Sequence, residues 1–202
     1  MNRRRGLLVD FGGVLTTDVF ASFEAFCRAE GFPPHAVRDR FLSDSASPNL
    51  LHELEAGRLA AADFETAFGR DLGVAPAGLI DRLLAGMRPD DAMIGAVQAA
   101  RRSGIRTALL SNSWGLGLYD RVMLDETFDV SIISGEVGMR KPDPAIYDLA
   151  VERLGLPPTS VVFVDDLPGN LKPALALGMV TLRHVSAEDS IPALERLLGT
   201  SL

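Results

Sequence analysis

The sequence predicts an α/β protein: a doubly wound, Rossmann-like parallel sheet with a helical segment inserted after the first strand. Short apolar runs repeatedly end at polar residues, and from residue 91 onward they alternate with helical patterns. Residues 16–88 contain helical patterns and no convincing strand. Continuous apolar runs of this length are typical of strands buried on both faces, and their alternation with helices is typical of right-handed βαβ crossovers.

Three apolar runs predict the clearest strands, and each leads into a polar residue. They are Leu7-Leu8-Val9 before Asp10, residues 107–110 before Ser111, and residues 161–164 before Asp165. Residues 130–133 and 180–182 are weaker candidates for two more strands. We therefore expect about five parallel strands.

The helices of the predicted core have recognisable ends. Asp143 and Pro144 supply an N-cap and a first-turn proline, and Gly155 closes that helix. A second helix is expected from about Asp91 to Gly104, and a third from near Pro168 to Gly178. These helices would supply the crossovers between the parallel strands.

The inserted segment, residues 16–88, has apolar side chains three or four positions apart. They are Phe20, Phe23, Phe26, Leu51, Leu54, Phe64, Phe68, Leu79 and Leu83. This spacing predicts a bundle of helices around its own core rather than a cofactor site. We expect residues 1–15 plus 89–202 to form the α/β core domain, residues 16–88 to form a separate helical domain, and Cys27 and Met123 to be packing residues.

Composition excludes several classes of protein. With 202 residues, 47% hydrophobic and 23% charged, the chain is typical of a globular protein, and its net charge of −7 argues against a nucleic-acid partner. Cys27 is the single cysteine, which rules out an internal disulfide and a thiolate metal cluster, and the histidines lack ligand spacing. No apolar run approaches the roughly 18 residues that span a bilayer, so we expect no membrane partner and a cytoplasmic location.

The predicted topology brings polar residues from three strands to one edge of the sheet. Ligands of open parallel sheets bind beyond the carboxyl ends of the strands, where Asp10, Ser111, Asp165 and Asp166 would lie. Singly, each of these residues is common at a strand end or helix cap. Three converging carboxylates, however, raise one another's pKa, and a hard divalent cation such as Mg²⁺ removes that repulsion.

Four motifs follow one another along the chain: VDFGGVL at residues 9–15, LSN at 110–112, GMRKPDP at 138–144 and VDD at 164–166. Their series resembles the four ordered motifs of the haloacid dehalogenase superfamily of hydrolases. The segment FVDDLPGNLKPA, residues 163–174, is most similar to the N-terminal phosphatase domain of soluble epoxide hydrolases. The resemblance implies that the helical insertion is a cap domain, which would close over the site and select the substrate.

The resemblance also implies roles for the residues of the first three motifs. Asp10 would be the nucleophile and form a covalent aspartyl intermediate. Ser111, with the backbone N–H of Asn112, would hydrogen-bond a phosphate oxygen. Lys141 would bind substrate and neutralise charge on both the nucleophile and the transferring group.

The implied metal ligands for Mg²⁺ are Asp10, the carbonyl of Gly12, Asp166 directly, and Asp165 directly or through water. Gly12 departs from the pattern, because most phosphatases of this superfamily have there a second aspartate that acts as general acid and base. A glycine carbonyl still serves a metal, but glycine cannot protonate a leaving group. Loss of a general acid typically costs about 10²–10⁴-fold in rate.

These observations predict a Mg²⁺-dependent, phosphatase-type hydrolase that acts on a small phosphorylated metabolite. One alternative is a 2-haloacid dehalogenase, a type that also lacks the second aspartate but needs no metal and generally lacks paired acids such as Asp165 and Asp166. Another is a catalytically weak protein that binds a metabolite. Phosphonate cleavage through a lysine of the insertion is disfavoured because residues 16–88 contain no lysine. Trp114 fits either a pocket-lining or a packing role.

Overall fold

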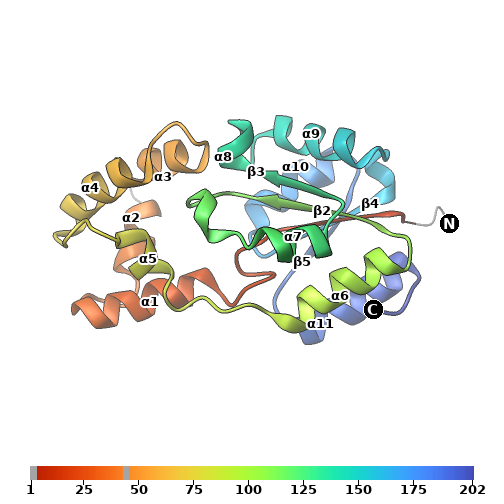
Figure 1. Ribbon diagram of the computed structural model, residues 1–202, viewed down its shortest axis with the longest axis horizontal. Helices are drawn as coiled ribbons and strands as arrows, with labels where there is room; N and C mark the ends of the chain where they lie inside the picture. The colour runs from red at the N-terminus through yellow and green to blue at the C-terminus, as the bar shows by residue number, and fades with distance from the viewer. Residues whose placement is uncertain (1–3, 43–45) are drawn as a thin grey trace.

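A five-stranded, wholly parallel sheet forms the centre of the protein, as predicted (Figure 1). The structure is a computed structural model that describes residues 4–42 and 46–202, so residues 1–3 of the predicted core and 43–45 of the predicted insertion lie outside it. The strand order is β3-β2-β1-β4-β5. The strands are β1 (Gly6–Val9), β2 (Arg106–Ser111), β3 (Val130–Ile133), β4 (Val161–Asp165) and β5 (Val180–Arg183).

Strand β1 lies at the middle of the sheet and is buried on both faces, which explains its unbroken apolar sequence. Because successive side chains alternate, Leu7 and Val9 pack into one hydrophobic cluster and Leu8 packs into another. Helices α6 (Asp91–Arg102) and α11 (Ala187–Leu198) supply the first cluster. Helices α9 (Pro144–Leu154) and α10 (Pro168–Ala176) supply the second, on the opposite face (Figure 1).

The predicted core helices begin and end close to the expected residues. Asp90 caps α6 by accepting from the Met93 N–H, and Asp143 caps α9 by accepting from the Ala145 N–H. Gly155 ends α9 with φ 64°, a conformation that favours glycine. Five further elements have no counterpart in the prediction: η1 (Leu116–Leu118), α7 (Arg121–Thr127), α8 (Ser134–Val137), η2 (Pro158–Ser160) and α11. None of the described helices is long and apolar enough to cross a membrane.

The helices between β1 and α6 pack around a third hydrophobic cluster, separate from the two that flank the sheet. They are α1 (Val19–Glu30), α2 (Ala36–Leu42), α3 (Ser47–Glu55), α4 (Ala61–Leu72) and α5 (Leu79–Leu84). Phe64 and Phe68 are fully buried there, and Phe41 stacks on Phe68 with ring centroids 4.7 Å apart. Two chain segments join this helical layer to the sheet (Figure 1), and they pair with each other at Thr16 and Pro89.

Candidate active site

Asp10 follows the central strand and lies at its carboxyl end. Its N–H donates to the Val164 carbonyl of β4, 3.0 Å away, which fixes the backbone beside the neighbouring strand. The Phe11 N–H donates to Asp10 Oδ1 at 2.7 Å and orients the carboxylate. Burial raises the pKa of Asp10 well above its usual value, while the nearby Lys141 charge opposes that rise.

Three carboxylates meet at this edge, as the topology predicted. One oxygen from each of Asp10, Asp165 and Asp166 lies within 4.8 Å of the others. Asp166 is half-buried, and its pKa is raised to about 6, first by burial and then by the charge of Asp165. Asp165 is fully buried and accepts hydrogen bonds from the Leu167 N–H at 2.9 Å and from Asn170 Nδ2 at 3.1 Å.

Lys141 places its ammonium group inside this acidic cluster. It comes from the loop between α8 and α9, and its side chain is fully buried. Its Nζ lies 2.7 Å from Asp10 Oδ1 and 2.7 Å from Asp165 Oδ2. Burial alone would lower the pKa of Lys141, but these two carboxylates raise it above its ordinary value and keep it protonated. When all four groups are ionised, the three carboxylates and the one ammonium group give the cluster a net charge of −2, which two further positive charges would neutralise.

Ser111 and Asn112 follow β2 at the same edge. Ser111 Oγ lies 2.9 Å from the hydroxyl of Tyr119, a buried residue whose pKa is raised to about 12 by burial. The Asn112 side chain accepts from the Lys141 N–H at 2.8 Å and donates to the Lys141 carbonyl at 3.0 Å. The structure thus gives the Asn112 side chain a role that the sequence did not predict, namely holding the backbone of Lys141.

The two glycines after Asp10 differ in how much room they leave for a side chain. Gly13 has φ +74°, and a Cβ there would lie 2.7 Å from Asp166 Oδ2, so a side chain would displace the carboxylate. At Gly12 the φ is ordinary, and a Cβ would approach Val19 Cγ2 to 3.0 Å. An aspartate at position 12 therefore requires Val19 to shift by a few tenths of an ångström.

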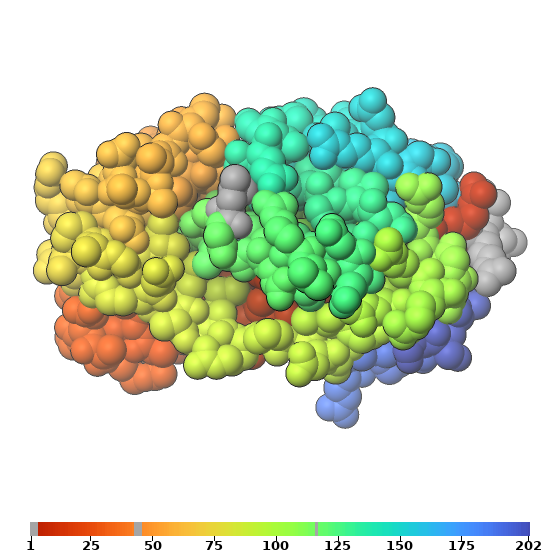
Figure 2. All heavy atoms as spheres, in the orientation of Figure 1, coloured from red at the N-terminus to blue at the C-terminus, as the bar shows by residue number. Residues whose placement is uncertain are grey.

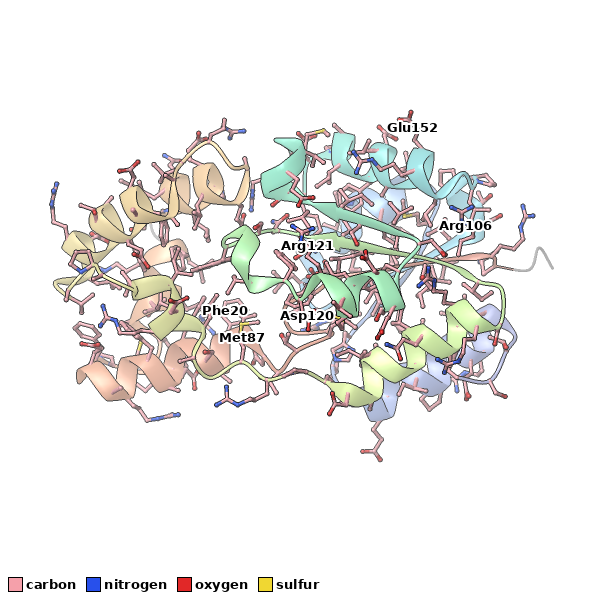
Figure 3. The ribbon with its side chains drawn as sticks, viewed as in Figure 1. Phe20, Met87, Arg106, Asp120, Arg121 and Glu152 are labelled. Atoms are coloured by element: carbon pink, nitrogen blue, oxygen red, sulfur yellow. The ribbon has the colours of Figure 1, made fainter. Side chains whose placement is uncertain are left out.

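One cavity of about 810 Å³ connects these residues with the helical layer. Six of the seven predicted site residues line it, and Asp165 is buried beneath: the lining residues are Asp10, Gly12, Ser111, Asn112, Lys141 and Asp166. Figure 3 labels three other lining residues, Phe20 of α1, Met87 between α5 and α6, and Asp120 before α7. In Figure 2 a hollow opens between the green segment that follows β2 and the yellow-green segment that joins α5 to α6.

Trp114 both lines the cavity and packs into the helical layer, so the two roles left open by the sequence hold together. Its ring lies 5.4 Å from Phe23, 5.7 Å from Phe41 and 5.9 Å from Phe64, measured between centroids. Because Trp114 belongs to the loop after β2, this contact inserts a residue of the sheet domain among aromatic rings of the helices. Trp114, Phe23 and Phe41 therefore give the cavity apolar surface on the side of the helical layer.

Sequence reasoning missed Asn170, Tyr119 and a buried carboxylate of α3, Glu55. Asn170 lies within the segment of residues 163–174 but was given no role of its own, although it hydrogen-bonds both oxygens of Asp165. Tyr119 had no distinguishing motif. Glu55 lies in the cavity wall but belongs to a helix far away in sequence, so only the spacing of the apolar residues around it was informative.

The parallel sheet, with three carboxylates and one ammonium group at its carboxyl edge and a helical layer inserted after its first strand, has the architecture expected from the four sequence motifs. Residues 5–178 match the sequence model of the haloacid dehalogenase-like hydrolases. The chain therefore belongs to that family. The family predicted from the four motifs is confirmed.

Individual relatives agree with the family. The chain is 36% identical over 115 residues to rat bifunctional epoxide hydrolase 2, a match that spans 54% of this chain and 21% of that protein. It is similar to a HAD-like family hydrolase from Porphyromonas gingivalis, with TM-score 0.75, 27% identity, and 96% and 97% of the two chains covered. A family enzyme from Bacteroides thetaiotaomicron in complex with magnesium and inorganic phosphate shares the fold, with TM-score 0.70, 24% identity, and 90% and 94% coverage.

Proposed function

We propose that the protein is a Mg²⁺-dependent, phosphatase-type hydrolase that acts on a small phosphorylated metabolite through a covalent intermediate on Asp10. The observation that carries the proposal is the position of Lys141, which lines the cavity and whose Nζ is 2.7 Å from both Asp10 and Asp165. A buried ammonium group in contact with the nucleophile stabilises the negative charge of a transferring phosphoryl group. In this proposal residues 16–88 form the cap that covers the substrate.

The donor set fits Mg²⁺. Its atoms are hard carboxylate oxygens within 4.8 Å of one another, and the cluster lacks two positive charges. Asp10, Asp166 and the carbonyl of Gly12 would hold the ion, and Asp165, already held by Asn170 and Lys141, would act directly or through water. When bound, Mg²⁺ would neutralise phosphate oxygens beside the nucleophile. The neighbour from B. thetaiotaomicron, solved with magnesium and phosphate, supports this assignment.

The residues divide the proposed reaction between them. An oxygen of Asp10 attacks phosphorus, the bond from phosphorus to the ester oxygen breaks, and water then hydrolyses the aspartyl phosphate. Ser111 and the backbone N–H of Asn112 bind phosphate oxygens, and the Lys141 ammonium balances the charge. Because Gly12 supplies no proton, we expect substrates with good leaving groups to react fastest.

A 2-haloacid dehalogenase is the second candidate, and Gly12 is the observation that favours it. The same attack by Asp10 would then displace halide from carbon. The half-exposed Asp166, which sits beside Asp165 and lines the cavity, weighs against it because it fits a metal and has no use in halide displacement.

Hydrolysis of p-nitrophenyl phosphate, with and without Mg²⁺, tests the proposal on wild type and Asp10→Asn. The control is Asp148→Asn, a change of the same chemistry at an exposed position on α9. We expect Mg²⁺-dependent release of p-nitrophenol that is lost in Asp10→Asn and retained in the control. Absence of turnover in wild type would refute the phosphatase proposal, and halide release from 2-haloacids would then support the dehalogenase.

A further inference from the structure

Glu55, the last residue of α3, carries a buried carboxylate outside the acidic cluster. The residue is 6% exposed and lines the same cavity, from the side of the helical layer. Its Oε2 accepts from Arg140 Nε at 2.6 Å and from Asn112 Nδ2 at 3.3 Å. Both partners belong to the sheet domain, so this carboxylate joins the two parts of the molecule within the cavity wall.

Both partners of Glu55 are also joined to Lys141, one through the chain and the other through hydrogen bonds. Arg140 precedes Lys141 in the chain, and Asn112 binds the Lys141 backbone through its N–H at 2.8 Å and its carbonyl at 3.0 Å. At the other end of the same residue, Nζ contacts Asp10 and Asp165. Hydrogen bonds therefore link a helix of the proposed cap to the backbone of Lys141, and the side chain of that same residue carries the ammonium group to Asp10.

The backbone around Glu55 is fixed against the sheet domain as well. The Glu55 carbonyl accepts from the hydroxyl of Ser134, at the start of α8. Gly57 has φ +69°, and a Cβ there would lie 2.5 Å from the Gly135 carbonyl, so the two backbones are in contact. Arg58 donates to the Gly138 carbonyl at 3.4 Å. The carboxylate thus reaches Arg140 and Asn112 only while α3 lies on α8.

We propose that Glu55 is a positioning residue: with the helical layer seated on the sheet, its carboxylate binds Arg140 and Asn112 and thereby holds Lys141 between Asp10 and Asp165. This inference rests on the proposed function. It adds that the active site is complete only while α3 lies against the sheet domain, because one of its supporting groups, Glu55, belongs to the helical layer. A glutamine at position 55 keeps the shape but removes the charge that binds Arg140.

The first test compares the kinetics of Glu55→Gln with those of Glu30→Gln. Glu30 pairs with Arg82 at 2.6 Å, but that pair joins two helices of the same layer and does not reach the sheet domain. With p-nitrophenyl phosphate we expect kcat of Glu55→Gln to fall at least tenfold while KM changes less than threefold, and Glu30→Gln to stay within twofold of wild type. A kcat of Glu55→Gln within twofold of wild type would overturn the inference.

Arg140→Gln and the Glu55→Gln/Arg140→Gln double variant separate positioning from a general loss of folding. The double variant removes both charges of the Arg140–Glu55 pair and leaves neither partner unpaired, so we expect it to fold even where a single variant is unstable. If both residues act on Lys141 together, the double variant loses no more than about threefold in kcat beyond either single variant. Fully multiplicative losses would contradict the inference.

Two further readouts do not depend on turnover. Trp114, the single tryptophan, is held among rings of the helical layer, so acrylamide quenching of its fluorescence reports how firmly that layer is seated. We expect greater quenching in Glu55→Gln than in Glu30→Gln. If wild type has no turnover, the proposed function fails, and titration with inorganic phosphate then tests the role of Glu55 alone. Phosphate affinity at least tenfold weaker in Glu55→Gln than in wild type supports the inference. Equal affinity in the two proteins, or no phosphate binding by wild type, overturns it.

Discussion

Lys141→Met removes the one ammonium group of the acidic cluster while keeping a side chain of similar length. The ion pairs of Lys141 with Asp10 and Asp165 both measure 2.7 Å, and the three side chains are 0%, 10% and 0% exposed. They therefore belong to the buried class, in which removal of one partner costs about 3–5 kcal/mol because a charge is left without compensation. For a chain of this size, that loss lowers the melting temperature by about 6–20 °C.

The assay is thermal and urea unfolding, followed by circular dichroism, in buffer without divalent cations. Arg121→Met is the matched control: it breaks a 2.6 Å pair with Glu136 in which the side chains are 51% and 35% exposed. Exposed pairs contribute about 0–1 kcal/mol, so the control is expected to unfold almost as wild type does. Equal stability losses in the two variants would refute the view that Lys141 compensates the buried carboxylates.

Three further predictions concern the glycines of the first motif and the helical core. The double variant Gly12→Asp/Val19→Ala gains a carboxyl group that can protonate the leaving group, and it loses the Val19 methyl that would lie 3.0 Å from the new Cβ. We expect its kcat for alkyl phosphates to rise by about 10²–10⁴-fold. A kcat no higher than that of Val19→Ala alone would contradict this prediction. Gly13→Ala would displace the Asp166 carboxylate and weaken Mg²⁺ binding at least tenfold by calorimetry, and unchanged affinity would exclude Asp166 as a ligand. Phe64→Ala is expected to lower the free energy of unfolding by about 3–5 kcal/mol in urea, and a loss below 1 kcal/mol would show that the helical layer does not depend on this fully buried ring.

The sheet was predictable because its strands are buried on both faces. A strand buried on both faces requires apolar side chains at successive positions, as at residues 161–164. The polar residue that follows then marks the carboxyl end of the strand. The last helix, α11, was missed although Ile191, Leu194 and Leu198 recur in it at helical spacing. Pro192 disfavours a helix there, but Pro173 lies inside α10 in the same way, and that helix was predicted. Short elements such as α8, with four residues, have no periodicity to detect.

The site residues likewise differ in how far their neighbours in the sequence predict their position. Asp10, Ser111 and Asp165 were predictable from strand ends, and Lys141 from the motif around it. Glu55 was not, because it lies 85 positions from Arg140 and its neighbours in sequence show only helical spacing. Contacts between distant segments depend on the packing of whole helices, which residue patterns do not encode locally.

The central place of β1 has a consequence for how the chain folds. Residues 6–9 pair on one side with residues 106–109 and on the other with residues 161–164, so the strand that precedes Asp10 has no partner nearby in the sequence. During synthesis β1 emerges first, and the helices of residues 19–84 that follow it are able to pack among themselves. Strand β1 has no partner until β2 has left the ribosome, and it pairs on one side only until β4 follows. Fragments that end before residue 161 therefore lack both Asp165 and the second edge of β1, and we expect them to aggregate through that exposed strand.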